Sequence, residues 1–254
     1  RRRYRSQLAY DGPLGYGWDF TYNETLFPQG DGDVVRSDGR GGQATWTRGG
    51  GGDFSSPPGH FGTLRQEIDG SYTLRDPDGF RRTYTSDGRL SGYQDRFGNT
   101  MTFTYDARGN LRRATDAFGR TIDFVFETFP DGRDRLVTLR DFTGREVQFS
   151  YTPNGDLAEV RSPIVSGTST LNDFPAGRIE RYGYREGTGT AADHNLTTVT
   201  RPREVALGGP PAITVNYGET TGTLEFDRVT SETLGGNNAS GVAAGGTVNY
   251  GYTA

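Results

Sequence analysis

The sequence of 254 residues contains no cysteine, and all 28 of its basic residues are arginine, because lysine is absent as well. The lack of cysteine excludes a disulfide framework, a thiolate nucleophile and a cysteine-ligated zinc site. The lack of lysine excludes a Schiff-base lysine and the lysine of a phosphate-binding P-loop. Only two histidines occur, His60 and His194, which excludes a histidine-rich metal centre. We therefore expect no bound metal and no cofactor.

Long apolar runs are also missing. No uninterrupted apolar stretch approaches the ~18 residues of a membrane-spanning helix, so no transmembrane segment is predicted. Val, Leu, Ile and Phe together provide 48 of the 254 residues, while the net charge is only −4. The 31 aromatic residues argue against disorder, which requires low hydrophobicity together with high net charge. Glycine is abundant, with 39 residues, so we expect a thin, aromatic-rich core built from strands and tight turns.

One spacing recurs through the middle of the chain. Leucines that follow Gly turns stand 21, 25 and 21 residues apart, and a set of aromatic residues stands 21, 21 and 25 apart. A second set of Gly turns falls between them. Three registers that share one period indicate a tandem repeat over residues 64–160. The leucines are Leu90, Leu111, Leu136 and Leu157, and the aromatic residues are Tyr84, Tyr105, Phe126 and Tyr151.

Each repeat is predicted to form two short strands joined by tight turns. Residues 100–105, 121–126 and 146–151 alternate polar side chains with aromatic or β-branched ones, as a strand with one buried face does. The Asp-Gly and Asn-Gly pairs supply the positive φ that hairpin turns need. No stretch has a convincing helical period. We therefore predict an all-β fold, a long antiparallel sheet of tandem β-hairpins that must twist and curve.

The residues of one repeat carry a family resemblance. The repeat begins with Asp95-Arg96-Phe97-Gly98-Asn99 and continues with Phe103-Thr104-Tyr105-Asp106-Ala107-Arg108-Gly109-Asn110-Leu111. Two further copies begin at Asp116 and Asp141. These units resemble the YD repeats of the rearrangement-hotspot (RHS) family, which includes teneurins and the C components of insecticidal toxin complexes. The segment Gly12–Phe20 is similar to the one that opens many RHS shells, so the resemblance covers residues 8–160.

The resemblance implies that the sheet is part of a spiral β-cocoon or a stacked assembly, since known members enclose a C-terminal toxin or effector domain. We count about 18–20 predicted strands, which at ~4.8 Å spacing make a ribbon ~90 Å long. A cavity of ~20 Å radius has a circumference of ~125 Å, so by the same spacing the ribbon completes less than one turn. The predicted partners are therefore a toxin or effector cargo, and either further repeats of the same chain or other copies of it.

The sequence divides into three parts according to how regular the predicted repeats are. Residues 1–63 are an RHS-like opening segment with Gly-rich hairpins, residues 64–160 carry the regular hairpins, and residues 161–254 carry degenerate repeats with Gly-rich insertions. The residues expected to matter are structural. Those expected to hold turns are Gly79, Gly98, Gly109, Gly119, Gly144 and Gly155. Those expected to pack the sheet are Tyr84, Phe103, Tyr105, Phe124, Phe126, Phe149 and Tyr151.

Few residues could carry chemistry. His60 and His194 lie in predicted loops, so each is expected to be an exposed loop residue rather than a catalytic base. The stretch 76–80 resembles the sequence at which RHS shells cleave themselves, but the same pattern also forms ordinary repeat turns. The net charge of −4 is unlike that of a nucleic-acid-binding domain. We therefore predict a structural protein that is not an enzyme, has no catalytic, cofactor or metal site, and does not bind nucleic acid.

Two other functions stay open beside the leading one. The chain could be a self-assembling subunit of an extracellular fibre or appendage, joined through exposed sheet edges at residues 1–5 and 248–252. It could instead be a carbohydrate-binding adhesin, with Trp18 and Trp46 stacking on sugars. The leading prediction is a non-enzymatic shell segment of a secreted or surface bacterial protein, wrapped around a toxin or effector.

Overall fold

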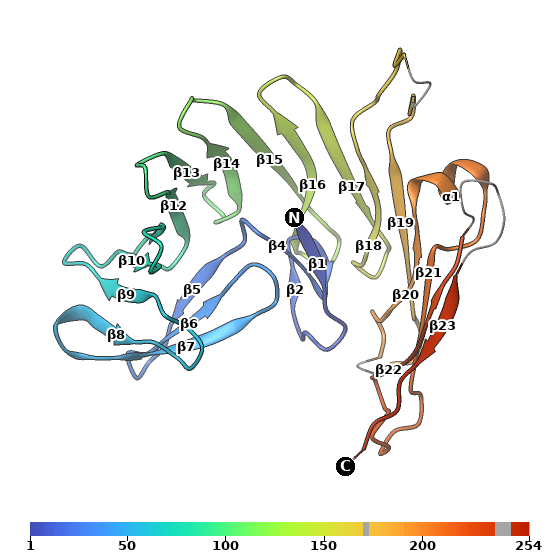
Figure 1. Ribbon diagram of the computed structural model, residues 1–254, viewed down its shortest axis with the longest axis horizontal. Coiled ribbons are helices and arrows are strands. Elements are labelled where there is room, and N and C mark those ends of the chain that lie inside the picture. The colour runs from blue at the N-terminus through green and yellow to red at the C-terminus, as the bar shows by residue number, and fades with distance from the viewer. Residues whose placement is uncertain (170–172, 191, 237–244, 254) are drawn as a thin grey trace. The chain divides into compact units, whose positions relative to one another are not determined.

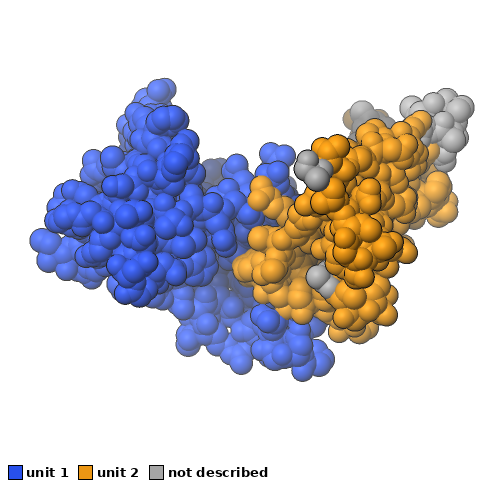
Figure 2. Space-filling model, turned by 90° about the horizontal axis from the view of Figure 1, so that it is seen from below, with its two compact units in different colours: residues 1–4, 18–145 blue, residues 5–17, 146–254 orange. Residues whose placement is uncertain are grey.

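The computed structural model describes residues 1–169, 173–190, 192–236 and 245–253. Within this part of the chain the regular structure is almost entirely β (Figure 1), apart from the 3-10 turn η1 (Gly50–Gly52) and the short helix α1 (Pro202–Leu207). The prediction of an all-β fold is thereby confirmed. The chain divides into two compact units (Figure 2), residues 1–4 with 18–145 and residues 5–17 with 146–254.

The first unit contains an antiparallel sheet in which each strand from β5 to β16 pairs with the next strand in the sequence. A smaller pair joins β1 to β4. In Figure 1 the strands follow one another in chain order from blue to green. They are β1 (Arg2–Tyr4), β4 (Trp18–Phe20), β5 (Thr25–Pro28), β6 (Val34–Ser37), β7 (Gln43–Arg48), β8 (Asp53–Ser55), β9 (Thr63–Gln66), β10 (Tyr72–Arg75), β11 (Arg81–Tyr84), β12 (Leu90–Gln94), β13 (Thr100–Tyr105), β14 (Leu111–Thr115), β15 (Thr121–Thr128) and β16 (Asp134–Asp141).

The second unit repeats this arrangement. Strands β17 to β23 form an antiparallel sheet with sequential pairing, and the short strands β2 and β3 form a hairpin of their own. Helix α1 follows β20 and has a proline in its first turn. The strands are β2 (Asp11–Gly12), β3 (Gly15–Tyr16), β17 (Glu146–Tyr151), β18 (Leu157–Arg161), β19 (Ile179–Tyr184), β20 (Leu196–Thr200), β21 (Ile213–Tyr217), β22 (Val229–Leu234) and β23 (Gly246–Asn249).

One kind of five-residue turn joins successive strands of the repeats. In the turn 106–110, the N–H of Asp106 donates to the carbonyl of Asn110 at 2.9 Å, and the N–H of Gly109 donates to the carbonyl of Asp106 at 3.0 Å. The Asp106 carboxylate accepts the N–H groups of Arg108 and Asn110 at 2.9 and 2.8 Å. A short polar side chain in the first position thus satisfies the turn's own backbone. The same backbone pattern begins at residues 67, 76, 85, 95, 116, 129, 141 and 152.

A β-bulge marks the aromatic residue of every repeat. The register of pairing shifts at Tyr84, Tyr105, Phe126 and Tyr151, at 21- to 25-residue intervals, and again at Tyr184 and Tyr217. A bulge bends its strand and increases the local right-handed twist. The residues paired with the aromatic side chains include Leu90, Leu111, Leu136, Leu157 and Leu196, each no more than 9 % exposed. The core of each unit therefore repeats with the same period as the sequence.

Candidate functional site: repeat bridges and contacts of the opening segment

The six glycines predicted to hold turns all occupy the fourth position of the five-residue turn. Their φ angles lie between 78° and 89°, in the left-handed region that glycine enters without steric cost. They are Gly79, Gly98, Gly109, Gly119, Gly144 and Gly155.

The seven aromatic residues predicted to pack the sheet divide into two groups. Tyr84, Phe103, Phe124 and Phe149 are buried, with at most 9 % of their surface exposed. Phe103 lies edge-on to Tyr93, with ring centroids 5.1 Å apart. The half-buried members are Tyr105, Phe126 and Tyr151, and all three sit at the bulges.

Three of the tyrosines at the bulges join one repeat to the repeat before it. The Tyr105 hydroxyl donates to the carbonyl oxygen of Leu90 at 2.7 Å, and the Tyr184 hydroxyl donates to that of Leu157 at 2.7 Å. The Tyr217 hydroxyl makes the equivalent bond to Leu196 at 3.0 Å, and burial raises its pKa to about 12. Burial also raises the pKa of Tyr105, so these two hydroxyls remain donors at physiological pH. Each bond ties two hairpins together independently of the strand pairing.

A pair of reciprocal substitutions tests these tyrosine bridges. Tyr105→Phe removes one hydroxyl and is expected to lower the free energy of unfolding by about 0.5–1.5 kcal/mol. Phe126 occupies the equivalent bulge without a hydroxyl, so Phe126→Tyr is expected to be neutral or to raise stability by up to about 1 kcal/mol. Urea unfolding of both variants measures the two values. A loss on Phe126→Tyr larger than that on Tyr105→Phe would contradict the bridge pattern.

The lowered pKa of one turn aspartate, Asp131, predicts that the stability of the fold depends on pH. A hydrogen bond from the Arg135 side chain, supported by the N–H of Arg133, lowers the pKa of Asp131 to about 2. A carboxyl whose folded pKa lies below its unfolded value of ~3.9 stabilises the fold above pH ~4, and this stability is lost as the pH falls towards 2. Asp131→Asn is therefore expected to be less stable than wild type at neutral pH and equally stable near pH 2. Urea midpoints that differ equally at both pH values would contradict this.

The first repeat is bridged differently, by a residue of the opening segment. The Tyr84 hydroxyl donates to the carboxylate of Glu24, which is only 4 % exposed. The same carboxylate accepts the Arg36 Nε–H at 2.9 Å and lies 3.4 Å from Nε of Arg82. Arg82 in turn contacts Asp76. Glu24 thus joins β6, β11 and the loop before β5 in one buried polar cluster.

Charge and burial balance each other in this Glu24 cluster. Burial alone would lower the pKa of Arg36, but Glu24 and Tyr84 beside it more than offset this, so the pKa is raised. Burial, followed by the charge of Glu24, raises the pKa of the Tyr84 hydroxyl well above its ordinary value. The guanidinium groups and the phenol therefore stay protonated, which is the state that donates to Glu24. A carboxylate in such a place is stable only while its partners are present.

The backbone of the opening segment also touches the first repeat. The N–H of Leu26 donates to the carbonyl of Gly88 at 2.8 Å, and Thr25 forms a single antiparallel bridge with Arg89. A Cβ atom on Gly88 would lie 1.9 Å from the carbonyl oxygen of Leu26. Strand β5 is therefore seated against the turn 85–89 at a distance that only glycine permits.

In the second unit, another part of the opening segment contacts the repeats. The Tyr16 ring stacks on the His194 ring, with centroids 3.6 Å apart and planes 14° from parallel. Nδ1 of His194 lies 3.0 Å from both carboxylate oxygens of Asp156, whose side chain is fully buried. The Tyr151 hydroxyl donates to the carbonyl of Pro13 at 3.1 Å. The hairpin of β2 and β3 is thereby held on this unit's repeats.

The backbone at this His194 contact is strained. Within the described residues, the only non-glycine residues with positive φ are His194 and Asp227, at 75° and 59°. The Nδ2 amide of Asn195 donates to Asp227 at 2.6 Å, while its buried Oδ1 has no partner among the described atoms. Such conformations persist only where surrounding contacts over-determine them. Burial raises the pKa of Asp156, and the His194 hydrogen bond acts in the opposite direction.

A double-mutant cycle tests the contact between His194 and Asp156. His194→Ala leaves a buried carboxylate without its donor and is expected to cost about 1–3 kcal/mol at neutral pH. Since burial already raises the pKa of Asp156, the cost falls as the pH drops through that pKa and the acid becomes protonated. Adding Asp156→Asn removes the charge and is expected to recover part of the loss. Urea unfolding that shows additive losses, with no recovery, would contradict this contact.

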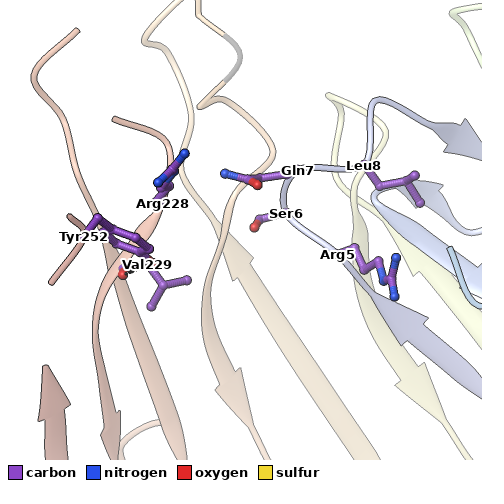
Figure 3. Close-up of a pocket in the computed structure, with 7 residues that line it drawn as sticks. All are labelled: Arg5, Ser6, Gln7, Leu8, Arg228, Val229 and Tyr252. Carbon is purple, nitrogen blue, oxygen red and sulfur yellow. Dashed lines mark hydrogen bonds between the residues drawn. The ribbon is translucent and has the colours of Figure 1, made fainter. Parts of the chain in front are cut away.

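A pocket of about 550 Å³ lies beside the start of the opening segment in the second unit (Figure 3). Its lining includes Ser6 and Gln7 from the opening segment and Arg228 from the segment before β22. The guanidinium of Arg228 lies 5.0 Å from the centroid of the Tyr252 ring, and the Gln7 amide donates to the carbonyl of Asp227 at 3.3 Å. None of the seven lining residues is acidic, so the pocket is basic and partly apolar.

The two histidines and the two tryptophans are the remaining candidate residues of the sequence. His60 is exposed, whereas His194 is not the exposed loop residue that we expected, because Tyr16 and Asp156 enclose it and its side chain is 30 % exposed. Trp18 and Trp46 are 6 % and 1 % exposed, so neither presents a ring face for a sugar. Among the described residues no group of three His, Cys, Asp or Glu side chains is placed to hold a metal. No helix in the described part of the chain is long and apolar enough to cross a membrane.

Sequence reasoning missed Glu24 and Asp156, the two buried carboxylates of these contacts. Each bonds a residue far away in the sequence, Tyr84 in one case and His194 in the other. Asp156 ends the repeat turn 152–156, but no motif marks either carboxylate as buried. No signal in the sequence marks Glu24, which stands between Asn23 and Thr25, whereas Asp156 stands directly before Leu157 of the repeat pattern.

The geometry defines a class of protein, an all-β array of tandem hairpins joined by tyrosine bridges and begun by a distinct opening segment. Comparison with family models agrees. Residues 84–121 match the model described as RHS Repeat, and residues 1–46 match a domain of unknown function, DUF6531. Residues 84–121 therefore carry RHS repeats, the repeat of the family that the sequence resembles.

Comparison with other proteins adds only remote likenesses. No curated protein matches the chain in sequence. A crystal structure of TcdB2-TccC3 without its hypervariable C-terminal region is 12 % identical at a TM-score of 0.39, over 85 % of this chain and 14 % of that one. A porin-like protein from Bacteroides uniformis is 13 % identical at a TM-score of 0.31, over 92 % and 98 % of the two chains. The Tc holotoxin pore of Photorhabdus luminescens is 12 % identical at a TM-score of 0.31, over 87 % and 15 %. This chain thus spans about a seventh of the length of the toxin-complex chains, and likenesses of this degree establish no shared activity.

Proposed function

We propose that the chain is a structural, non-enzymatic segment of a β-shell in a secreted or surface-exposed bacterial RHS-repeat protein, where it wraps a toxin or effector cargo. The observation that carries the proposal is the tyrosine bridge, in which the hydroxyl of one repeat bonds the carbonyl of the repeat before it. Such a bond can be repeated without limit along a chain. It builds a wall of any length, which is what an enclosing shell requires.

The bulges supply the curvature of that wall. Each repeat carries a bulge at the same residue, so each adds a similar bend and twist to the sheet. Equal increments of bend produce a ribbon that curves in one direction. At ~4.8 Å per strand a ribbon of this size covers less than one turn around a ~20 Å cavity, so a closed shell needs further repeats or further copies.

The opening segment begins the array in this proposal. Arrays of repeats need a distinct end, because the outermost repeat has no neighbour to cover it. Glu24 takes the bond that the Tyr84 hydroxyl would otherwise make to a preceding repeat. The division of the sequence at residues 63 and 160 is likewise proposed as a functional division into opening segment, regular wall and modified wall.

The test uses the native protein that contains these residues, purified from its source. We expect the mass of the denatured native protein to lie far above 27.8 kDa. We also expect it to contain a segment that proteases cleave only after the wall is unfolded. A mass near 27.8 kDa, with polymers that disappear when residues 1–10 are deleted, would instead establish the fibre subunit. A large mass with every other segment freely digested would contradict the wrapping of cargo.

A further inference from the structure

Three phenylalanines are exposed on the turns of the first unit. Phe97, Phe118 and Phe142 are 75 %, 81 % and 58 % exposed, whereas the aromatic residues within the repeat strands β9 to β16 are buried or half-buried. The three phenylalanines occupy the second or third position of the five-residue turns 95–99, 116–120 and 141–145. The turn bonds are made by the backbone and by aspartates, so the fold does not require aromatic side chains there.

These turns share one edge of the sheet. In an antiparallel sheet with sequential pairing, every second turn lies on the same edge, and the three turns follow β12, β14 and β16. Arg120 confirms that two of them are neighbours, because its guanidinium lies 5.3 Å from the Phe118 ring and 5.8 Å from the Phe142 ring. Arg96 lies 4.6 Å from the Phe97 ring. The edge therefore presents a ladder of alternating aromatic rings and guanidinium groups, here called the Phe–Arg ladder.

The opposite edge is chemically different. Its turns in the same region have Ser86 and Asp87, Ala107 and Arg108, or Pro130 and Asp131 in their middle positions. None of these six residues is aromatic. The two edges therefore offer a built-in comparison, with the same turn geometry but with exposed aromatic side chains at the second and third turn positions on one edge only.

We propose that the Phe–Arg ladder is a docking surface for a second ribbon of the same hairpin repeats, and specifically for a second copy of this chain. The rungs of the ladder lie two strands apart, about 9.6 Å, and a second hairpin ribbon presents groups at the same spacing. Rings and guanidinium groups attract each other, so two ladders displaced by half a rung are complementary. The docking requires only the repeat ribbon, so it stands whether or not the wall encloses a cargo.

The size of the ladder sets the strength of the contact. Phenylalanines bury roughly 150–250 Å² each, so three that are mostly exposed offer about 400 Å² per copy and about 800 Å² in a pair. Stable complexes bury about 1,200–2,000 Å² in total. Two isolated copies are therefore expected to associate weakly and reversibly. Ribbons held side by side in one assembly would dock far more completely, since their effective concentration is high.

The absence of cysteine allows a direct test with the 254-residue chain. Ala117 and Ala107 are both exposed and both occupy the second position of their turns, one on the ladder edge and one on the opposite edge. Each is replaced by cysteine in a separate variant, which gives a single thiol per molecule. Disulfide dimers are then followed over time under mild oxidation. A third variant carries Ala117→Cys together with Phe97→Ser, Phe118→Ser and Phe142→Ser.

Ladder docking predicts that Ala117→Cys forms dimers at least about tenfold faster than Ala107→Cys, because docked thiols meet at an effective concentration near millimolar. Adding the three serine substitutions is expected to bring the rate down to that of Ala107→Cys. Equal rates for the two single-cysteine variants would overturn the proposal without bearing on the shell. An undiminished rate in the serine variant, with its circular dichroism unchanged, would overturn it as well.

Discussion

Replacing Glu24 by alanine is expected to lower the free energy of unfolding by about 3–5 kcal/mol, the penalty for leaving buried charges without their partner. Glu24 is 4 % exposed and accepts from Tyr84 and Arg36, while Arg82 lies 3.4 Å away. Without it Arg36 loses its carboxylate partner, while Arg82 keeps its contact with Asp76. The loss should also free the loop before β5, so protease cleavage near residue 24 is expected to become faster.

Glu67 provides the matched control for this substitution. Its side chain is 42 % exposed and it lies 4.0 Å from Arg65, an ion pair on the surface. Glu67→Ala is expected to change stability by at most about 1 kcal/mol. Urea unfolding of the two variants compares a buried carboxylate with an exposed one in the same unit. Similar losses in both would show that Glu24 does not fasten the opening segment to the first repeat.

The second large effect is expected at Gly88. Gly88→Ala places a Cβ 1.9 Å from the carbonyl oxygen of Leu26, at a φ of 85°. Left-handed strain and the collision together are expected to cost about 2–5 kcal/mol. Because the colliding atom belongs to the backbone of β5, the strand must move away from the repeat. Deuterium exchange of the Leu26 amide, which donates to Gly88, should become faster.

Substitution of Gly119 provides the control that separates the backbone strain at a positive φ from the collision of the added Cβ atom. Its φ is 78°, and a Cβ added there would meet nothing within 4 Å. Gly119→Ala is therefore expected to cost only the strain of the left-handed backbone, about 1–2 kcal/mol. The difference between the two variants in free energy of unfolding measures how closely β5 packs against the turn 85–89. If Gly88→Ala costs no more than Gly119→Ala, the seating of β5 against the turn 85–89 is wrong.

The strands and turns of the repeats could be predicted because their determinants are local. The turn at Asp106 needs a short polar side chain and a glycine three residues later, and both stand together in the sequence. Alternation along residues 100–105 likewise places Phe103 in the core. A pattern repeated every 21 to 25 residues then makes each prediction support the others.

The contacts of the opening segment could not be predicted because their partners are distant. Glu24 and Tyr84 are separated by 60 residues, and Asp156 and His194 by 38. A lone glutamate or histidine in a loop is most often exposed, and only the three-dimensional arrangement shows otherwise. His194 does lie in a loop as predicted, but the prediction that it is exposed was wrong for this reason.

The second half of the chain shows how the repeat survives changes in sequence. Beyond residue 160 the Asp-x-x-Gly pattern loosens, yet bulges at Tyr184 and Tyr217 keep the geometry of the earlier repeats. Both tyrosines retain the bond to the preceding repeat. Beyond residue 160, the bulged tyrosine is therefore a better marker of the repeat than the turn.

Electron cryomicroscopy of the native full-length protein tests most directly whether these repeats form the wall of a shell. We predict an antiparallel wall that includes residues 84–141, with the Tyr105 hydroxyl bonded to the carbonyl of Leu90 and polypeptide density enclosed behind the wall. A native protein in which these residues form a solid domain with no enclosed chain, or a filament built from separate copies, would contradict it.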